Sequence, residues 1–217
     1  TYQLFGDFFN LFGMDSAFCN VSFVDKKLQS IKVTSQLMNS IWSSLILGLI
    51  VSFPYILWEI WRFVSPGLTK KEIQKSRGFI FIASTLFFLG VLFSFYIIAP
   101  ISIHFLYNYQ ITDAIENSFT LESHIGLVTN MLLGVSILFE LPVLIYFLTK
   151  IGLITPEFLK KYRKHALVVV LILAAIITPP DVASQVIVAI PILILYEIGI
   201  KVSRRVIKNQ EKNANKS

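Results

Sequence analysis

The sequence predicts an all-α protein that crosses a membrane several times. Hydrophobic residues make up 55% of its 217 residues and charged residues only 15%, and the mean hydropathy is +0.70. These values lie outside the usual range of soluble domains. The apolar residues are gathered into uncharged runs, several of them as long as the roughly 20 residues that a helix needs to cross a bilayer core.

Five apolar segments are expected to form transmembrane helices. They are Val33 to Trp58, Gly78 to Tyr107, Ser123 to Thr149, Ala166 to Ile177 and Val182 to Tyr196. The first three are long enough to span a bilayer. The last two are short, roughly 20 Å each at the rise of an α-helix. Short spans predict local thinning of the bilayer around this pair, or snorkelling of the flanking lysines and arginines.

A polar turn separates the last two helices. Residues Thr178 to Gln185 read Thr-Pro-Pro-Asp-Val-Ala-Ser-Gln. Two consecutive prolines cannot continue a helix, because each lacks an N–H and restricts the residue before it. We therefore expect a hairpin at one membrane face, in which Asp181 or Ser184 caps the following helix.

The distribution of charge predicts the orientation. Sixteen of the 19 lysines and arginines lie in three regions, Arg62 to Arg77, Lys150 to Lys164 and Lys201 to Lys216. The connections over 108–122 and 179–181 contain acids and no basic residue. By the positive-inside rule, the basic regions are cytoplasmic and the acidic connections face outward.

This topology divides the chain into three parts. Residues 1–32 form an extracytoplasmic segment, residues 33–200 the transmembrane helical bundle and residues 201–217 a cytoplasmic basic tail. No signal peptide explains an extracytoplasmic start. We therefore expect a cytoplasmic segment and one more helix to precede Thr1 in the complete protein. The tail is expected to contact anionic membrane lipid rather than nucleic acid.

The sequence shows no apparatus for catalysis. It has no His-Glu-x-x-His, no Gly-x-Ser-x-Gly, no glycine-rich phosphate loop and no cysteine cluster for a metal. His104, His124 and His165 are widely separated in the sequence and are expected to be interfacial anchors. We expect neither an enzyme nor a cofactor.

Glu140 is a candidate functional residue, because it interrupts the third apolar segment. An ionised carboxylate at that depth is costly unless it faces protein, water or a partner. Pro142 follows closely, and a proline within a span frees a carbonyl and bends the helix. The alternative role for Glu140 is a protonated carboxyl that hydrogen-bonds between helices, and the two roles are compatible.

Other polar groups suggest contacts within and between chains. Thr178 and Gln185 flank the hairpin, where such groups could hydrogen-bond a partner helix in lipid. Spacing predicts that Glu59 pairs with Arg62, and that Glu197 pairs with Lys201. Glu72 lies among lysines and arginines, and on its own it is typical of a solvated acid at the start of a helix.

Four strings occur in order between about Ser35 and Lys201. They are Phe53-Pro54-Tyr55…Trp58…Trp61-Arg62-Phe63-Val64-Ser65-Pro66-Gly67-Leu68…Glu72, Phe139-Glu140-Leu141-Pro142, Thr178-Pro179-Pro180-Asp181…Ser184-Gln185 and Ile190-Pro191…Leu195-Tyr196-Glu197. Together they resemble the TatC family, the multi-spanning subunit of the twin-arginine protein translocase. The resemblance implies a concave, glove-like bundle of six helices, of which this chain holds five, in a bacterial-type inner membrane.

The same resemblance implies a function. TatC is a signal-peptide receptor and a core component of a translocase that exports folded proteins using the proton-motive force. Its implied partners are twin-arginine signal peptides and single-span subunits of the TatA/TatB type, in an oligomeric complex. Glu72 and Glu140 are then expected to contact the signal peptide, and Thr178 and Gln185 to dock a partner helix. The residues expected to hold the shape are Phe53, Pro54, Pro142, Pro179, Pro180 and Asp181.

Three other functions are considered. A proton-coupled secondary transporter would also place an acid such as Glu140 at mid-depth, but it would usually show repeated halves or several polar groups along broken helices. An intramembrane protease would need paired catalytic groups, which the sequence lacks. A membrane scaffold would bind partner helices without recognising a signal.

Overall fold

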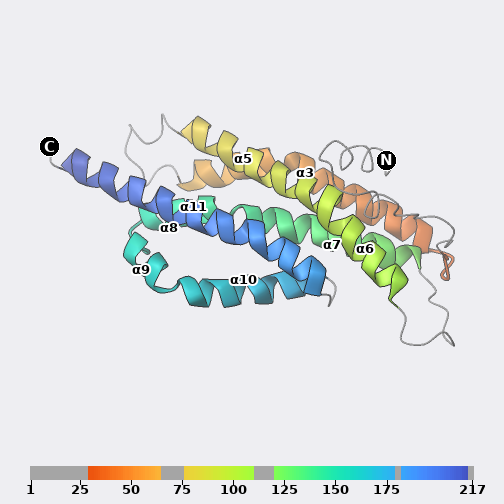
Figure 1. Ribbon diagram of the computed structural model, residues 1–217. Helices are drawn as coiled ribbons and strands as arrows, with labels where there is room; N and C mark the ends of the chain where they lie inside the picture. The colour runs from red at the N-terminus through yellow and green to blue at the C-terminus, as the bar shows by residue number, and fades with distance from the viewer. Residues whose placement is uncertain (1–28, 65–75, 110–119, 179–181, 215–217) are drawn as a thin grey trace, which may run out of the picture.

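The structure is a computed structural model that describes residues 29–64, 76–109, 120–178 and 182–214 (Figure 1). The expected extracytoplasmic segment lies almost entirely outside these residues, as do Glu72, Pro179, Pro180 and Asp181. The regular structure of the described chain is helical, with short connections and one isolated bridge between Gln29 and Thr120. Its helices are α3 (Ser35–Val64), α5 (Ser76–Phe93), η2 (Ser94–Ile98), α6 (Ala99–Asn108), α7 (Leu121–Phe139), α8 (Leu141–Lys150), α9 (Pro156–Lys161), α10 (Arg163–Ile177) and α11 (Val182–Ala214).

Four stretches of the described chain are long and apolar enough to cross a membrane. They are Ser35–Phe63, Ile80–Tyr107, Leu121–Lys150 and Ser184–Glu211. The first three confirm the predicted long spans, with ends shifted by a few residues. The fourth predicted helix is also present, as α10, and its 15 residues make it short as expected. Thinning of the bilayer around it stays a prediction.

The last helix is not short, and the prediction that it ends at Tyr196 is wrong. α11 has 33 residues and crosses the predicted boundary at residue 200 without a break. Beyond Tyr196 the sequence is rich in residues with high helix propensity and contains no proline. Two contacts also fasten this part of α11 to the end of α8: Thr149 donates a hydrogen bond to Ser203 over 2.8 Å, and the Gln210 side chain donates one to the Lys150 carbonyl over 3.1 Å.

Two of the spans are interrupted, each next to a proline. The second passes through the π-helical turn η2 shortly before Pro100, which stands in the first turn of α6. The third is interrupted at Glu140, where α7 ends, and continues as α8, which has Pro142 in its first turn. Proline lacks the N–H for the bond to the preceding turn and its ring crowds that turn, so the ladder must change register or break. The predicted break beside Glu140 is confirmed.

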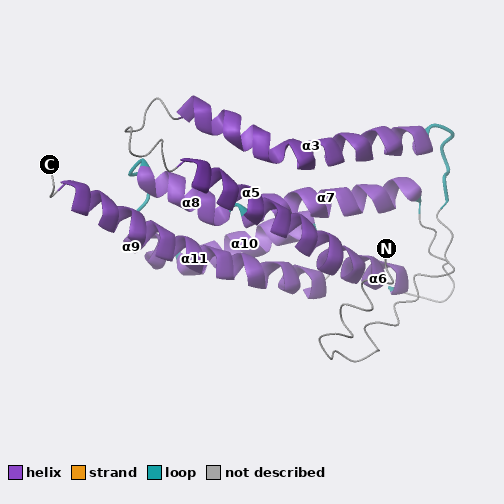
Figure 2. Cartoon of the chain, turned by 90° about the horizontal axis from the view of Figure 1, so that it is seen from above, coloured by secondary structure: helices purple, strands orange, loops and turns teal. Residues whose placement is uncertain are grey.

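The main core lies between α6, α7, α10 and α11, and α3 stands along one edge of the bundle (Figure 2). Its fully buried side chains include Ile98, Met131, Val135, Val188 and Ile192. A smaller cluster joins α3 to α5 through Ile46, Ile50 and Phe87. The ring of Phe53 stacks on that of Phe87, with the centroids 3.5 Å apart, while Pro54 lies within α3.

Glycine allows α5 and α7 to touch backbone to backbone. A Cβ atom at Gly90 would lie 2.7 Å from the Cα of Ser136 and 3.0 Å from the side chain of Phe139. Real Cβ atoms do not approach so closely, so a larger residue at position 90 would have to separate the two helices. This contact fixes the turn of α7 that leads directly into Glu140.

We expect Gly90→Ala to lower the free energy of unfolding by about 1–3 kcal/mol, because the added methyl group overpacks a backbone contact. The matched control is Gly48→Ala in α3, where a Cβ atom would meet nothing within 4 Å. That change should be neutral, or stabilising by up to about 1 kcal/mol through helix propensity. Thermal unfolding of the purified protein in detergent measures both; equal melting temperatures would contradict the close contact.

Candidate functional site

Glu140 is a buried acid without a partner in the described chain. It occupies the junction of α7 and α8, in the middle of the third span. Both of its carboxyl oxygens are buried, and neither has a hydrogen-bond partner among the described residues. Burying a carboxyl group without a partner costs free energy in any apolar surrounding. The alternative role, a hydrogen bond from Glu140 to another helix of this chain, is not found within the described ranges.

The backbone around Glu140 is held firmly although its side chain is not. Its carbonyl oxygen accepts hydrogen bonds from Val143 and Leu144, at 2.9 and 3.0 Å, which start α8. Just before it, the ring of Phe139 packs on that of Phe93, with centroids 5.5 Å apart. Just after it, Pro142 is buried. The acid therefore projects from a fixed point of the bundle, which suits a group that must meet something from another molecule.

Two hydroxyl groups that sequence reasoning missed share this unpaired state. The Oγ atoms of Ser84 and Ser94 are buried and have no partner within the described chain. Both residues belong to the span that packs against α7, and Ser94 is fully buried at the π-helical turn. The signal that could have singled them out is a serine within an otherwise apolar span, where a hydroxyl group needs a partner.

At the hairpin, Thr178 and Gln185 make hydrogen bonds to α10. The Thr178 hydroxyl donates to the Ala174 carbonyl over 2.9 Å, and the Gln185 amide reaches from α11 to the Leu171 carbonyl over 3.0 Å. Next to Gln185, buried Ser184 accepts a 2.7 Å hydrogen bond from Ser102 of α6. The two predicted docking residues therefore lie on adjoining helices, and both have donors engaged within the chain.

The predicted ion pairs have mixed outcomes. Glu59 does pair with Arg62, at 3.4 Å. Glu197 does not pair with Lys201 as predicted, because Arg163 at the start of α10 approaches it to 2.8 Å. Arg163, on a different helix, thus makes the charge-assisted hydrogen bond to Glu197 in place of Lys201 on the same helix. The adjacent Tyr196 hydroxyl donates to the Leu159 carbonyl over 2.8 Å, so the middle of α11 is tied both to α9 and to the start of α10.

Of the two predicted signal-contact residues, Glu140 is the one that lies within the described structure. Glu72 lies outside the described residues, as do the structural residues Pro179, Pro180 and Asp181. Of the histidines, His124 contacts Tyr107 through a 3.0 Å hydrogen bond. In the described ranges no three His, Cys, Asp or Glu residues are grouped so that they could hold a metal ion.

Comparison with known proteins gives a consistent family. Residues 4–191 match the family model for the Sec-independent protein translocase protein TatC. The chain is 44% identical over 184 residues to the TatC protein of Blattabacterium sp. subsp. Periplaneta americana, covering 85% of this chain and 69% of the relative. It is 40% identical over 185 residues to that of Carboxydothermus hydrogenoformans, covering 85% and 76%.

Two solved structures of the twin-arginine translocase receptor TatC are also similar. The first has a TM-score of 0.71 at 32% sequence identity and covers 95% of this chain and 89% of that chain. The second, determined in the detergent DDM, has a TM-score of 0.73 at 33% identity and covers 93% and 88%. The sequence comparisons and the structural comparisons therefore indicate the same family over most of the chain.

Proposed function

Since this chain belongs to the TatC family of Sec-independent protein translocase proteins, we propose that it is the signal-peptide receptor of a twin-arginine translocase. Members of the family are transport components and not enzymes, so its unusual polar groups serve recognition. The observation that carries the proposal is Glu140, a buried carboxyl group that this family's fold holds at mid-span without a partner in the described chain.

Glu140 is suited to receive a hydrogen-bond donor from outside the chain. Its oxygens accept, its backbone is fixed by the start of α8, and its surroundings are apolar. A donor brought by a signal peptide or a partner helix would remove the cost of the unpaired carboxyl group. Binding would therefore be favoured, because the donor would supply the hydrogen bond that the Glu140 carboxyl group lacks in the unbound receptor.

Glu72 is proposed to contact the twin arginines. This acid lies in the connection between α3 and α5, among lysines and arginines that mark a cytoplasmic region. A guanidinium group pairs with a carboxylate through two parallel hydrogen bonds, which lysine cannot reproduce. Two adjacent arginines would thus be distinguished from two lysines by geometry and not by charge.

The surface beside α10 and α11 is proposed to dock single-span subunits of the TatA/TatB type. Gln185 donates its amide N–H to Leu171, but its side-chain carbonyl oxygen has no partner among the described residues. In lipid, a hydrogen bond to such an oxygen holds a partner helix in register. Thr178, bonded within α10, is proposed to shape the same surface.

The protein is proposed to lie in a bacterial-type inner membrane, with five spans in this chain arranged as a concave, glove-like bundle. The C-terminus of α11 would be cytoplasmic and the residue 1 side extracytoplasmic, because the three basic regions gather on one side. Assembly into an oligomeric complex and use of the proton-motive force are proposed on the same grounds of family membership.

Replacing Glu72 with glutamine should weaken binding of a twin-arginine signal by about 1.5–3 kcal/mol, the range for a hydrogen bond to a charged group. Photocrosslinking in membranes from a probe placed in the signal peptide measures it, with Arg-Arg and Lys-Lys versions of one precursor. Wild type should discriminate between the two precursors, and Glu72→Gln should not. Glu157→Gln, which changes an exposed acid at the start of α9, is the control. Equal crosslinking of the Arg-Arg precursor to wild type and to Glu72→Gln would refute the role of Glu72.

Glu140→Leu should stabilise the purified protein and abolish export. The leucine removes an unpaired buried carboxyl group, a gain of about 1–3 kcal/mol, but offers nothing to an incoming donor. Glu140→Gln keeps an acceptor of similar shape and should retain export. Melting temperature in detergent and export of a folded reporter are the two measurements. Unchanged export in Glu140→Leu would remove this residue from the mechanism.

Gln185→Leu should reduce copurification of the single-span subunit several-fold, because one interhelical hydrogen bond in lipid contributes on the order of 1 kcal/mol. Ile190→Leu changes an exposed side chain further along α11 and should leave copurification unaltered. If both variants retain the subunit equally, docking does not use Gln185.

A further inference from the structure

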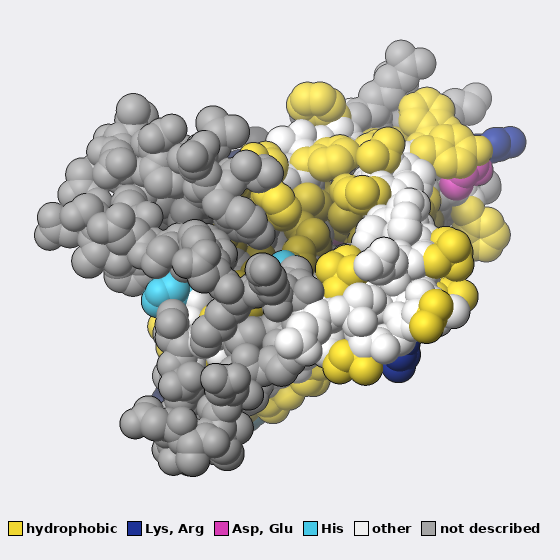
Figure 3. Space-filling model, turned by 90° about the vertical axis from the view of Figure 1, so that its right-hand side faces the viewer, with side chains coloured by type: hydrophobic (Ala, Val, Ile, Leu, Met, Phe, Trp, Pro, Cys, Tyr) yellow, Lys and Arg dark blue, Asp and Glu magenta, His cyan; other side chains and the backbone are white. Residues whose placement is uncertain are grey.

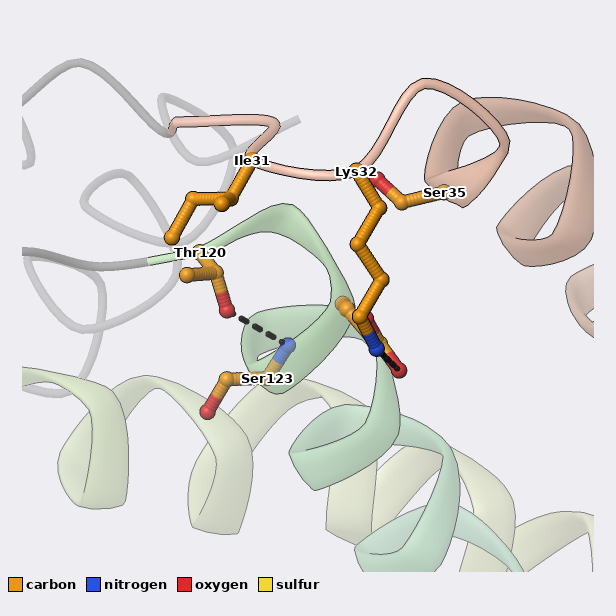
Figure 4. Close-up of a pocket in the computed structure, with 6 residues that line it drawn as sticks. Ile31, Lys32, Ser35, Thr120 and Ser123 are labelled. Carbon is orange, nitrogen blue, oxygen red and sulfur yellow. Dashed lines mark hydrogen bonds and ion pairs between the residues drawn. The ribbon is translucent and has the colours of Figure 1, made fainter.

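A groove lined by both polar and apolar residues lies where α3 and α7 begin, away from the residues discussed so far. It has a volume of about 560 Å³, and its lining includes Lys32, Ser35, Asn39, Trp42, Glu122 and Gly126. A smaller hollow of about 430 Å³ adjoins it, shares Lys32, Ser35 and Glu122, and adds Thr120 and Ser123 (Figure 4). Cavities of these sizes are in the range that small ligands occupy.

The groove is built by specific hydrogen bonds. The Leu121 N–H donates to the Gln29 carbonyl over 3.0 Å, which fastens the residues before α3 to the start of α7. Thr120 caps α7 by accepting from the Ser123 N–H over 3.2 Å. Between the two hollows, Lys32 Nζ lies 3.2 Å from a carboxylate oxygen of Glu122 (Figure 4). One cation and one anion, both exposed, thus lie side by side on the wall.

Asn39 places an unpaired amide donor beside this groove. The residue is only 7% exposed, and its Nδ2 group is buried with no acceptor among the described residues. It stands one turn after Ser35 on the face of α3 that lines the groove. An amide donor left unpaired costs about 1–3 kcal/mol. A ligand that brought an acceptor oxygen here would remove this cost.

The position of the groove suits an amphiphilic ligand. Both helices are among those able to cross a membrane, and Lys32 and Glu122 mark where their apolar stretches begin. Below the charges, α3 exposes Met38, Ile41 and Trp42. Figure 3 shows hydrophobic side chains over much of the described surface on this side of the molecule, with a basic and an acidic side chain together at its edge. Charged side chains next to a row of exposed apolar side chains are the arrangement found at a membrane interface.

We propose that this groove binds the headgroup of a phospholipid that carries a primary ammonium group, of the phosphatidylethanolamine class. Its phosphate oxygens accept from the Asn39 amide and the Lys32 ammonium, and its own ammonium donates to the Glu122 carboxylate. The acyl chains follow the exposed side chains of α3. Because the wall carries one charge of each sign, a zwitterionic headgroup matches it. An anionic headgroup would bring no cation to pair with the Glu122 carboxylate and would be repelled by it. A choline headgroup has no N–H to donate.

The test uses the purified chain in detergent, supplied in turn with dioleoyl lipids that carry ethanolamine, choline or glycerol headgroups. Retained lipid is counted by native mass spectrometry, and melting temperature is followed in parallel. The ethanolamine lipid should be retained at least fivefold more than the other two. Equal retention of all three would overturn the proposal, as would soluble phosphoethanolamine binding as tightly as the lipid.

Two variants and a control make the assignment specific. Glu122→Gln and Asn39→Leu should each lower retention of the ethanolamine lipid at least fivefold. Glu59→Gln, which breaks the exposed pair with Arg62 on the same α3 helix, should not. Asn39→Leu should also raise the melting temperature without lipid while losing the increase that lipid gives, which a purely structural role would not produce. Undiminished retention in both groove variants would overturn the site.

Discussion

Helices inside a bilayer gain no hydrophobic free energy by packing on one another, because lipid tails are as apolar as leucine. This constraint governs the whole bundle. Its helices associate through glycines that admit a neighbour and through hydroxyl groups that bond across helices. Gly90 brings α5 onto α7, the Ser102–Ser184 bond joins α6 to α11, and the Thr149–Ser203 bond joins α8 to α11.

Against that background, an unpaired polar group is informative. Most described polar side chains that enter the core find partners, so the few that do not are candidates for contact with another molecule. Glu140 is the most costly of them, since it can carry a charge. Gly90 and Phe93 hold the turn from which it projects. The packing of α5 on α7 thus positions the acid without satisfying it, and a receptor gains affinity from that arrangement only when its ligand arrives.

The sequence was sufficient for features that depend on composition and local chemistry. Uncharged length predicted the first three spans, and Pro142 predicted the break beside Glu140. It was insufficient where tertiary contacts decide. Its apolar pattern ends near Tyr196, yet α11 continues because α8 supports it. Glu197 has Lys201 four residues away, yet it pairs with Arg163, which only the fold brings near. Likewise, nothing local to Asn39 reveals that its amide lacks an acceptor.

The two kinds of unpaired group in this chain call for opposite partners. Glu140 offers acceptors in the middle of a span, where lipid headgroups do not reach, which is why we propose a donor carried on another polypeptide as its partner. Asn39 offers a donor near the start of a span, beside a lysine and a glutamate. A phosphate group at the membrane surface can meet it there. The depth of each group and its need for a donor or an acceptor are therefore the reasons for proposing protein recognition at Glu140 and lipid binding at Asn39.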